Sequence, residues 1–359
     1  MQYLKKFDFF LLFLILPFII ISLVLINEIS HKLFYKELIY IGIGFLVFVT
    51  VYLIPIRKLL WLIPVIYWLN VVLLIAVDIF GVKILGAKRW LRIPLVNATI
   101  QPAEFMKTTL LLMLGYLIYK YPPRPLYSFK EFLRLSVYII IPFILIVKEP
   151  DLGTALITLI IGFGVLFIIG VDKKVWLGIG IFSILFAPVY YKFFMKDYQK
   201  ERIEHFLNKP GYHVKQSIIA IGSGGLKGKS KKNASQANLK FLPIVSSDFI
   251  FAYLVERFGF LGALFVIGLY FLLVAYFIDK AEKLKDDYFA KVMYGGVGIM
   301  IFTYAFINMA MTMDLAPVVG VPLPLISHGG TSFINFMILF AILENLVSRK
   351  EFIHTYGVK

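Results

Sequence analysis

Long, uninterrupted runs of apolar residues dominate this chain, and short polar segments separate them. Seven runs are each close to the 20 residues with which a helix crosses about 30 Å of hydrocarbon. They lie at 9–26, 38–56, 59–77, 154–171, 175–194, 258–278 and 292–311. Three further runs, at 104–119, 134–147 and 331–347, are shorter or begin at polar motifs. The pattern predicts ten transmembrane helices. The fold class is therefore all-α, a polytopic integral membrane protein with a single membrane domain over 1–359.

The composition agrees with this pattern. Of the residues, 60% are hydrophobic and only 16% are charged. A soluble protein of this length needs more polar surface, because its outside faces water. The chain has no cysteine, which excludes a disulfide framework and a thiolate metal site.

The net charge of +16 is interpreted as a topology signal rather than as a sign of nucleic-acid binding. The first run follows Lys5 and Lys6 as in a signal peptide, but no small-residue cleavage site comes after it, so we expect a retained span. With a cytoplasmic N-terminus, 17 Lys and Arg fall in cytoplasmic segments and 8 in short external loops. This split predicts a multi-pass protein of the cytoplasmic (inner) membrane with both termini in the cytoplasm.

One predicted external loop, 196–247, departs from that distribution. It carries ten basic residues, among them Arg202, against three acidic ones. A solvated loop that touches anionic lipid would explain the charge. The alternative is a site for an anion such as a phosphate-bearing substrate.

Polar, Gly- and Pro-rich segments gather on the same predicted external side. They are Gly86–Pro94, Gln101–Lys107, Lys148–Thr154 and Gly320–Ser332. Each can be an ordinary turn. Together they predict a shared cavity.

Glu104 and Lys107 stand three residues apart just after Pro102, at the predicted start of a span. On a helix they share a face and can pair. A capping glutamate with a snorkelling lysine would be the structural explanation. Ionisable groups that enter a span usually face a cavity, which favours a functional one.

Asp248 follows Ser246 and Ser247 at the head of an apolar run. A serine cap with an acid in the first turn is a common helix start, so a purely structural role is open. The functional hypothesis is a general base at the mouth of a cavity. The two roles are compatible.

Two apparent ligand motifs are rejected. Gly228-Lys229-Ser230 imitates the end of a phosphate-binding loop, but Ser223 stands where that motif needs its first glycine. The histidines show no zinc-ligand spacing. No metal ligand is predicted, and a divalent cation (Mg²⁺ or Mn²⁺) at a diphosphate would need no particular spacing.

The ordered set of motifs resembles the SEDS family (shape, elongation, division and sporulation), and within it the RodA branch more than the FtsW branch. The short N-terminus and the lack of a long tail favour that branch. The motifs that carry the resemblance over nearly the whole chain are Gln101-Pro-Ala-Glu-Phe-Met-Lys107, Glu149-Pro-Asp-Leu-Gly-Thr154, Tyr198-Gln199 with Arg202, Gln216-Ser217, Ile221-Gly-Ser-Gly-Gly225, Phe241-Leu-Pro243, Asp248-Phe-Ile-Phe251, Phe258-Gly-Phe-Leu-Gly262 and Leu323-Pro-Leu-Ile-Ser-His-Gly-Gly330.

The resemblance implies a peptidoglycan glycosyltransferase that polymerises lipid II outside the cytoplasmic membrane, for cell elongation and shape. It implies a class B penicillin-binding protein as transpeptidase partner, and lipid II and the growing lipid-linked glycan as ligands. Asp248 would be the catalytic base. The expected substrate-binding residues are Glu104, Lys107, Lys148, Asp151, Arg202, Ser327 and His328.

Four motifs depart from the family's usual residues, at Ser246-Ser247, Glu256-Arg257, His328 and Glu149. Arg257 puts a two-carboxylate scheme after Asp248 in doubt. Two other function classes stay open at this point. A flippase of lipid-linked precursors would use the same charged cavity with alternating access, and a non-catalytic scaffold would leave both Asp248 and the basic loop unexplained.

Overall fold

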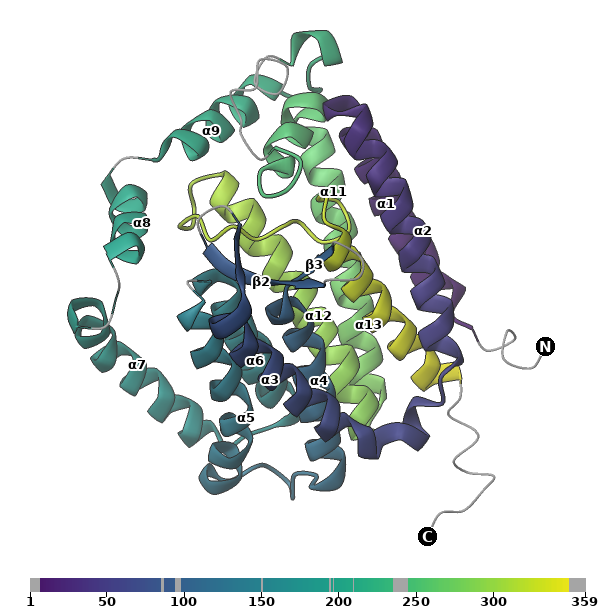
Figure 1. Cartoon of the computed structure of the whole chain (residues 1–359), viewed down its shortest axis with the longest axis vertical. Helices are drawn as coiled ribbons and strands as arrows, with labels where there is room; N and C mark the ends of the chain where they lie inside the picture. Colours follow the sequence, from purple (N-terminus) through teal and green to yellow (C-terminus); the bar gives the residue numbers. More distant parts are fainter. Residues whose placement is uncertain are drawn as a thin grey trace.

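The apolar runs fold into long α-helices, most of which pack as one bundle (Figure 1). The computed structural model describes residues 7–84, 87–93, 98–149, 151–193, 195, 197–208, 210–234 and 245–348, without the side chains of 84, 87, 93, 98, 197–199, 202, 203 and 205. The long helices are α1 Phe9–Ile29, α2 His31–Leu53, α3 Ile63–Phe80, α4 Pro102–Lys120, α5 Phe129–Lys148, α6 Leu152–Ile169, α7 Lys173–Phe193, α11 Ile250–Lys283, α12 Tyr288–Thr312 and α13 Gly330–Ser348. A 3₁₀ segment, η2 Ile56–Leu62, leads into α3.

Each of the ten predicted spans overlaps one of these helices. Within the described residues, eight helices are long and apolar enough to cross a membrane. The other two, α4 and α5, have 19 and 20 residues, and charged side chains interrupt their apolar sequence, Glu104 and Lys107 in α4 and Glu131 and Arg134 in α5. The all-α, polytopic prediction is confirmed.

Helix α12 is the centre of the bundle and packs against α4, α6 and α11. In its most apolar stretch 78% of the residues are buried, against 6% for α7. Figure 1 shows α7 at the edge of the assembly, followed by α8 Asp197–Asn208 and α9 Tyr212–Gly224. The segment that was predicted as a loop, 196–247, is therefore partly helical, and it also contains the short 3₁₀ helix η3 Lys231–Asn233.

Contacts at Asp8 define one end of the bundle. The Asp8 backbone N–H donates to Glu344 near the end of α13, at 3.1 and 3.2 Å. Its carboxylate accepts from Lys280 near the end of α11 at 2.7 Å. The start of α1 thus lies beside the end of α13, as an even number of crossings requires. Asp248, which precedes α11, lies at the opposite end.

A small antiparallel sheet follows α3, and the sequence pattern did not predict it. Its strands are β1 Val82–Ile84, β2 Ala87–Ile93 and β3 Ala98–Ile100, with β2 in the middle. Lys88, Arg89 and Arg92 interrupt the apolar alternation of β2, so the strand has no clear periodicity. The strand is stabilised instead by hydrogen bonding to β1 and β3 and by packing against α3 and α4.

Helix α11 begins at Ile250, earlier than the predicted span, and bends at Gly259. Gly259 has φ +68°, and a Cβ there would lie 2.4 Å from the Gly228 nitrogen. The Gly228 N–H donates to Gly224 O (2.8 Å) and the Lys229 N–H donates to Glu256 O (2.9 Å). The first bond closes the turn and the second joins it to α11. Both N–H groups are therefore used within the protein and are not available to a phosphate, which supports the rejection of the phosphate-loop interpretation.

Candidate active site

A chamber of about 720 Å³ lies at the Asp248 end of the bundle. Its wall includes Arg89, Glu104, Asp151, Asp248 and His328, which come from five separate parts of the chain. The prediction that the polar segments share one cavity is confirmed. Three carboxylates face this one chamber, and each loses part of its hydration there, which costs free energy. Such a grouping favours a functional role for the chamber.

Asp248 is positioned by its backbone and by α12. The Asn308 side-chain amide donates to Asp248 O (2.9 Å) and to Val321 O (2.6 Å), which ties two wall segments together. Burial raises the pKa of the Asp248 carboxyl, the Asp151 carboxylate adds to the rise, and a hydrogen bond with Ser247 opposes it. A carboxyl with a raised pKa is a better proton acceptor when ionised, as a general base requires.

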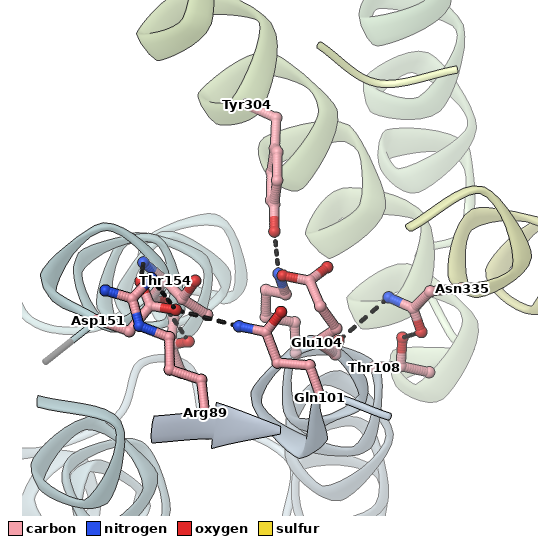
Figure 2. Close-up of polar contacts among 10 residues, drawn as sticks. Arg89, Gln101, Glu104, Thr108, Asp151, Thr154, Tyr304 and Asn335 are labelled. Carbon is pink, nitrogen blue, oxygen red and sulfur yellow. Dashed lines mark hydrogen bonds and ion pairs between the residues drawn. The ribbon is translucent and has the colours of Figure 1, made fainter. Parts of the chain in front are cut away.

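Glu104 and Lys107 form the pair that their spacing predicted. The Lys107 ammonium donates to Glu104 Oε1 at 2.6 Å, and it also donates to the Tyr304 hydroxyl of α12. The Lys107 side chain is completely buried, whereas Glu104 reaches the wall. Figure 2 shows Tyr304 pointing down to this pair from above. Sequence reasoning missed Tyr304, because one tyrosine within an apolar helix is no functional signal.

Asp151 caps α6 and joins three elements. Its Oδ1 accepts from the Thr154 N–H at 3.2 Å. Its Oδ2 accepts from Gln101 at 3.1 Å and lies 3.5 Å from an Arg89 guanidinium nitrogen (Figure 2). Arg89 comes from β2, so the unpredicted sheet supplies a cation to the chamber. Without tertiary structure, nothing in the sequence distinguishes Arg89 from its basic neighbours.

His328 is bound to a buried carboxylate that the sequence analysis did not include. Its Nδ1 lies 2.6 Å from Glu37 Oε2 on α2, and the Glu37 side chain is 2% exposed. The His328 backbone N–H donates to Ser246 O at 2.7 Å. The Ser327 hydroxyl donates to Ser247 O at 2.5 Å, so Ser327 fastens this turn to the Asp248 segment rather than lining the chamber.

Several predicted substrate contacts lie elsewhere. Lys107 and Ser327 are off the chamber wall, and Lys148 is exposed at the end of α5. The Arg202 side chain lies outside the described part of the chain. Among the described residues, no three His, Cys, Asp or Glu side chains are grouped to hold a metal ion.

The fold and the site define a polytopic helical membrane protein with a carboxylate-lined chamber at one end of its bundle. The family model described as "Cell cycle protein", of the FtsW, RodA and SpoVE proteins, matches residues 3–351. The chain belongs to this family, the one that its motifs resemble.

Curated relatives extend over most of the chain. The peptidoglycan glycosyltransferase MrdB of Helicobacter pylori (strain J99) is 52% identical over 95% of this chain and 90% of that protein. MrdB of Escherichia coli K12 is 37% identical over 87% and 84%. A probable peptidoglycan glycosyltransferase FtsW of Trichlorobacter lovleyi is 32% identical over 80% and 75%.

Solved structures share the fold. A chain from a structure titled as a peptidoglycan synthase complex that coordinates polymerization and crosslinking matches with a TM-score of 0.83. It is 25% identical, over 96% of this chain and 98% of that chain. A point mutant of the rod shape determining protein RodA of Thermus thermophilus matches with a TM-score of 0.72 at 24% identity over the same shares.

Proposed function

We propose that this protein is a peptidoglycan glycosyltransferase that polymerises lipid II into glycan strands at the outer face of the cytoplasmic membrane, for cell elongation and shape. The observation that carries the proposal is the convergence of Asp248, Glu104 and Asp151 on one chamber. The names of its relatives, at up to 52% identity, agree with it.

The chemistry follows from the groups on the wall. The acceptor sugar hydroxyl loses its proton to the Asp248 carboxylate as its oxygen attacks the anomeric carbon of the donor. The new glycosidic C–O bond forms while the bond to the lipid diphosphate breaks, and the diphosphate leaves as an anion. Arg89, held by Asp151, is a cation on the wall that can meet this negative charge.

Orientation and partnership are part of the proposal. The uneven distribution of Lys and Arg favours cytoplasmic termini and, with that orientation, a chamber on the outer side of the membrane. A reporter inserted between α9 and α11 should then give an extracytoplasmic signal, and a cytoplasmic one would invert the topology. The similar solved complex couples polymerization to crosslinking, which favours a class B penicillin-binding protein as the partner here.

The decisive experiment is polymerisation of labelled lipid II by purified Asp248→Asn and wild-type protein. Asparagine is nearly isosteric and is tolerated at a helix start, but it cannot accept the proton. We expect a loss of about 10²–10⁴-fold, the usual contribution of a general base. Asp172→Asn is the matched control, because Asp172 also precedes a helix and accepts from the Lys174 N–H at 2.9 Å.

The outcomes separate the function classes. A glycosyltransferase makes glycan without a partner's own polymerase, and it loses this activity with Asp248→Asn without a fall in the melting temperature. A flippase would move lipid II across vesicles and make no glycan. Retention of most of the rate by Asp248→Asn would remove Asp248 as the base and leave Glu104 or Asp151 as candidates.

A further inference from the structure

Tyr304 occupies a position in the chamber that none of the sequence motifs indicated. It lies on α12 four residues before Asn308, so both side chains project from the same face of that helix. Asn308 holds the Asp248 carbonyl, and Tyr304 lines the chamber. The central helix therefore presents two polar groups to the candidate site from one face.

The contact with Lys107 orients the Tyr304 hydroxyl. An ammonium has three donors and no acceptor, so the Tyr304 oxygen must accept from Lys107. The phenolic proton then points away from Lys107. Among the described residues the structure shows no hydrogen bond that this hydroxyl donates, and Tyr304 lines the chamber, so a molecule in the chamber can accept the proton.

The position of the ring is fixed by its neighbours. Tyr304 is 1% exposed, and its ring packs edge-on against the Phe336 ring, with 6.1 Å between the two ring centroids. The Lys107 nitrogen lies 4.7 Å from the Tyr304 ring centroid. A rigid phenol with a cation bound to its oxygen is a polarised donor, since hydrogen bonds in a chain strengthen one another.

We propose that Tyr304 is a substrate-contacting hydrogen-bond donor for a diphosphate oxygen of the lipid-linked substrate, and that Lys107 is the positioning residue that aims it. This inference rests on the proposed glycosyltransferase function. An anionic oxygen is the favoured acceptor because the buried ammonium lies directly behind the hydroxyl. Lys107 thereby influences the substrate although it does not line the chamber.

The test compares Tyr304→Phe with Tyr294→Phe. Both replace a buried tyrosine of α12, but the Tyr294 hydroxyl donates to Leu343 O at 3.2 Å and is not on the chamber wall. Tyr304→Phe keeps the ring and its packing and removes only the donor. We expect kcat/KM for lipid II to fall by roughly 10- to 100-fold, the range for one hydrogen bond to a charged group, and Tyr294→Phe to stay near wild type.

A binding measurement keeps this test independent of polymerisation. Undecaprenyl diphosphate and inorganic pyrophosphate should each raise the melting temperature of wild-type protein, and the rise should shrink in Tyr304→Phe. A reduced effect of the lipid alone would assign the contact to a lipid-borne diphosphate. Unchanged protection by both probes would overturn the diphosphate assignment, even if activity fell.

Lys107→Gln tests the aiming role. Glutamine retains a donor but loses the charge, so activity should fall, and Tyr304→Phe should cost less in this background than in wild type. Full activity of Lys107→Gln would overturn the aiming role. If wild-type protein makes no glycan, the proposed function fails. If wild type makes glycan and Tyr304→Phe equals it in activity and in probe binding, only this inference fails.

Discussion

Replacement of Glu149 by glutamine should change how the stability of this protein depends on pH. Glu149 lies between α5 and α6 and is 1% exposed, and neither of its carboxyl oxygens has a hydrogen-bond partner among the described residues. Burial raises the pKa of this carboxyl from 4.5 to about 9. Asp151 and Asp78 add to the rise and Arg89 opposes it.

The direction of the effect follows from proton counting. Below pH 4.5 the carboxyl is protonated in both states and contributes no pH dependence. Between pH 4.5 and about 9 the folded state keeps a proton that the unfolded state has lost, so stability falls as pH rises. The slope is about 1.4 kcal/mol per pH unit, which amounts to roughly 3 kcal/mol at pH 7 as an upper limit.

The assay is thermal unfolding in detergent from pH 5 to 9. Glu149→Gln should lose this slope, so its melting temperature relative to wild type should rise steadily across the range. Glu131→Gln, which replaces an exposed carboxylate in the first turn of α5, should run parallel to wild type, because that group is ionised in both states over this window. Parallel curves for Glu149→Gln and wild type would refute a neutral, buried Glu149.

Three further outcomes are expected. Glu104→Ala and Lys107→Ala should each impair polymerisation of lipid II, because each change leaves the other charge unpaired. In a double-mutant cycle the loss of activity in the double variant should be well below the sum of the two single losses. Additive losses would exclude a coupled pair. Glu37→Leu should lower the melting temperature more than Glu37→Gln, since glutamine keeps an acceptor for His328 and leucine leaves the partly buried His328 ring nitrogen without this partner, at a cost of about 1–3 kcal/mol. Equal melting temperatures would contradict this. Arg202→Ala should raise the KM for lipid II more at low salt than at high salt, because screening weakens attraction at a distance; a KM unchanged at both salt concentrations would remove Arg202 from substrate recruitment.

The places of the long apolar helices were readable from the sequence because lipid imposes a local rule. A segment that crosses hydrocarbon must satisfy its own backbone, so length and apolarity suffice to find it. The Glu104–Lys107 pair was equally local, since three residues along a helix bring two side chains together. Asp248 and Asp151 could be identified from the sequence as candidate site residues, because each belongs to a short motif that resembles those of one family.

Contacts between distant segments were decided by tertiary structure alone. Arg89 reaches Asp151 only because a short sheet forms over α3 and α4. Glu37 meets His328 across 291 residues, and Tyr304 meets Lys107 across 197. The sequence predicted those contacts that a residue makes within its own helix. Which groups face one another across the chamber depends on helix packing, and one chain's local periodicity carries no information about that packing.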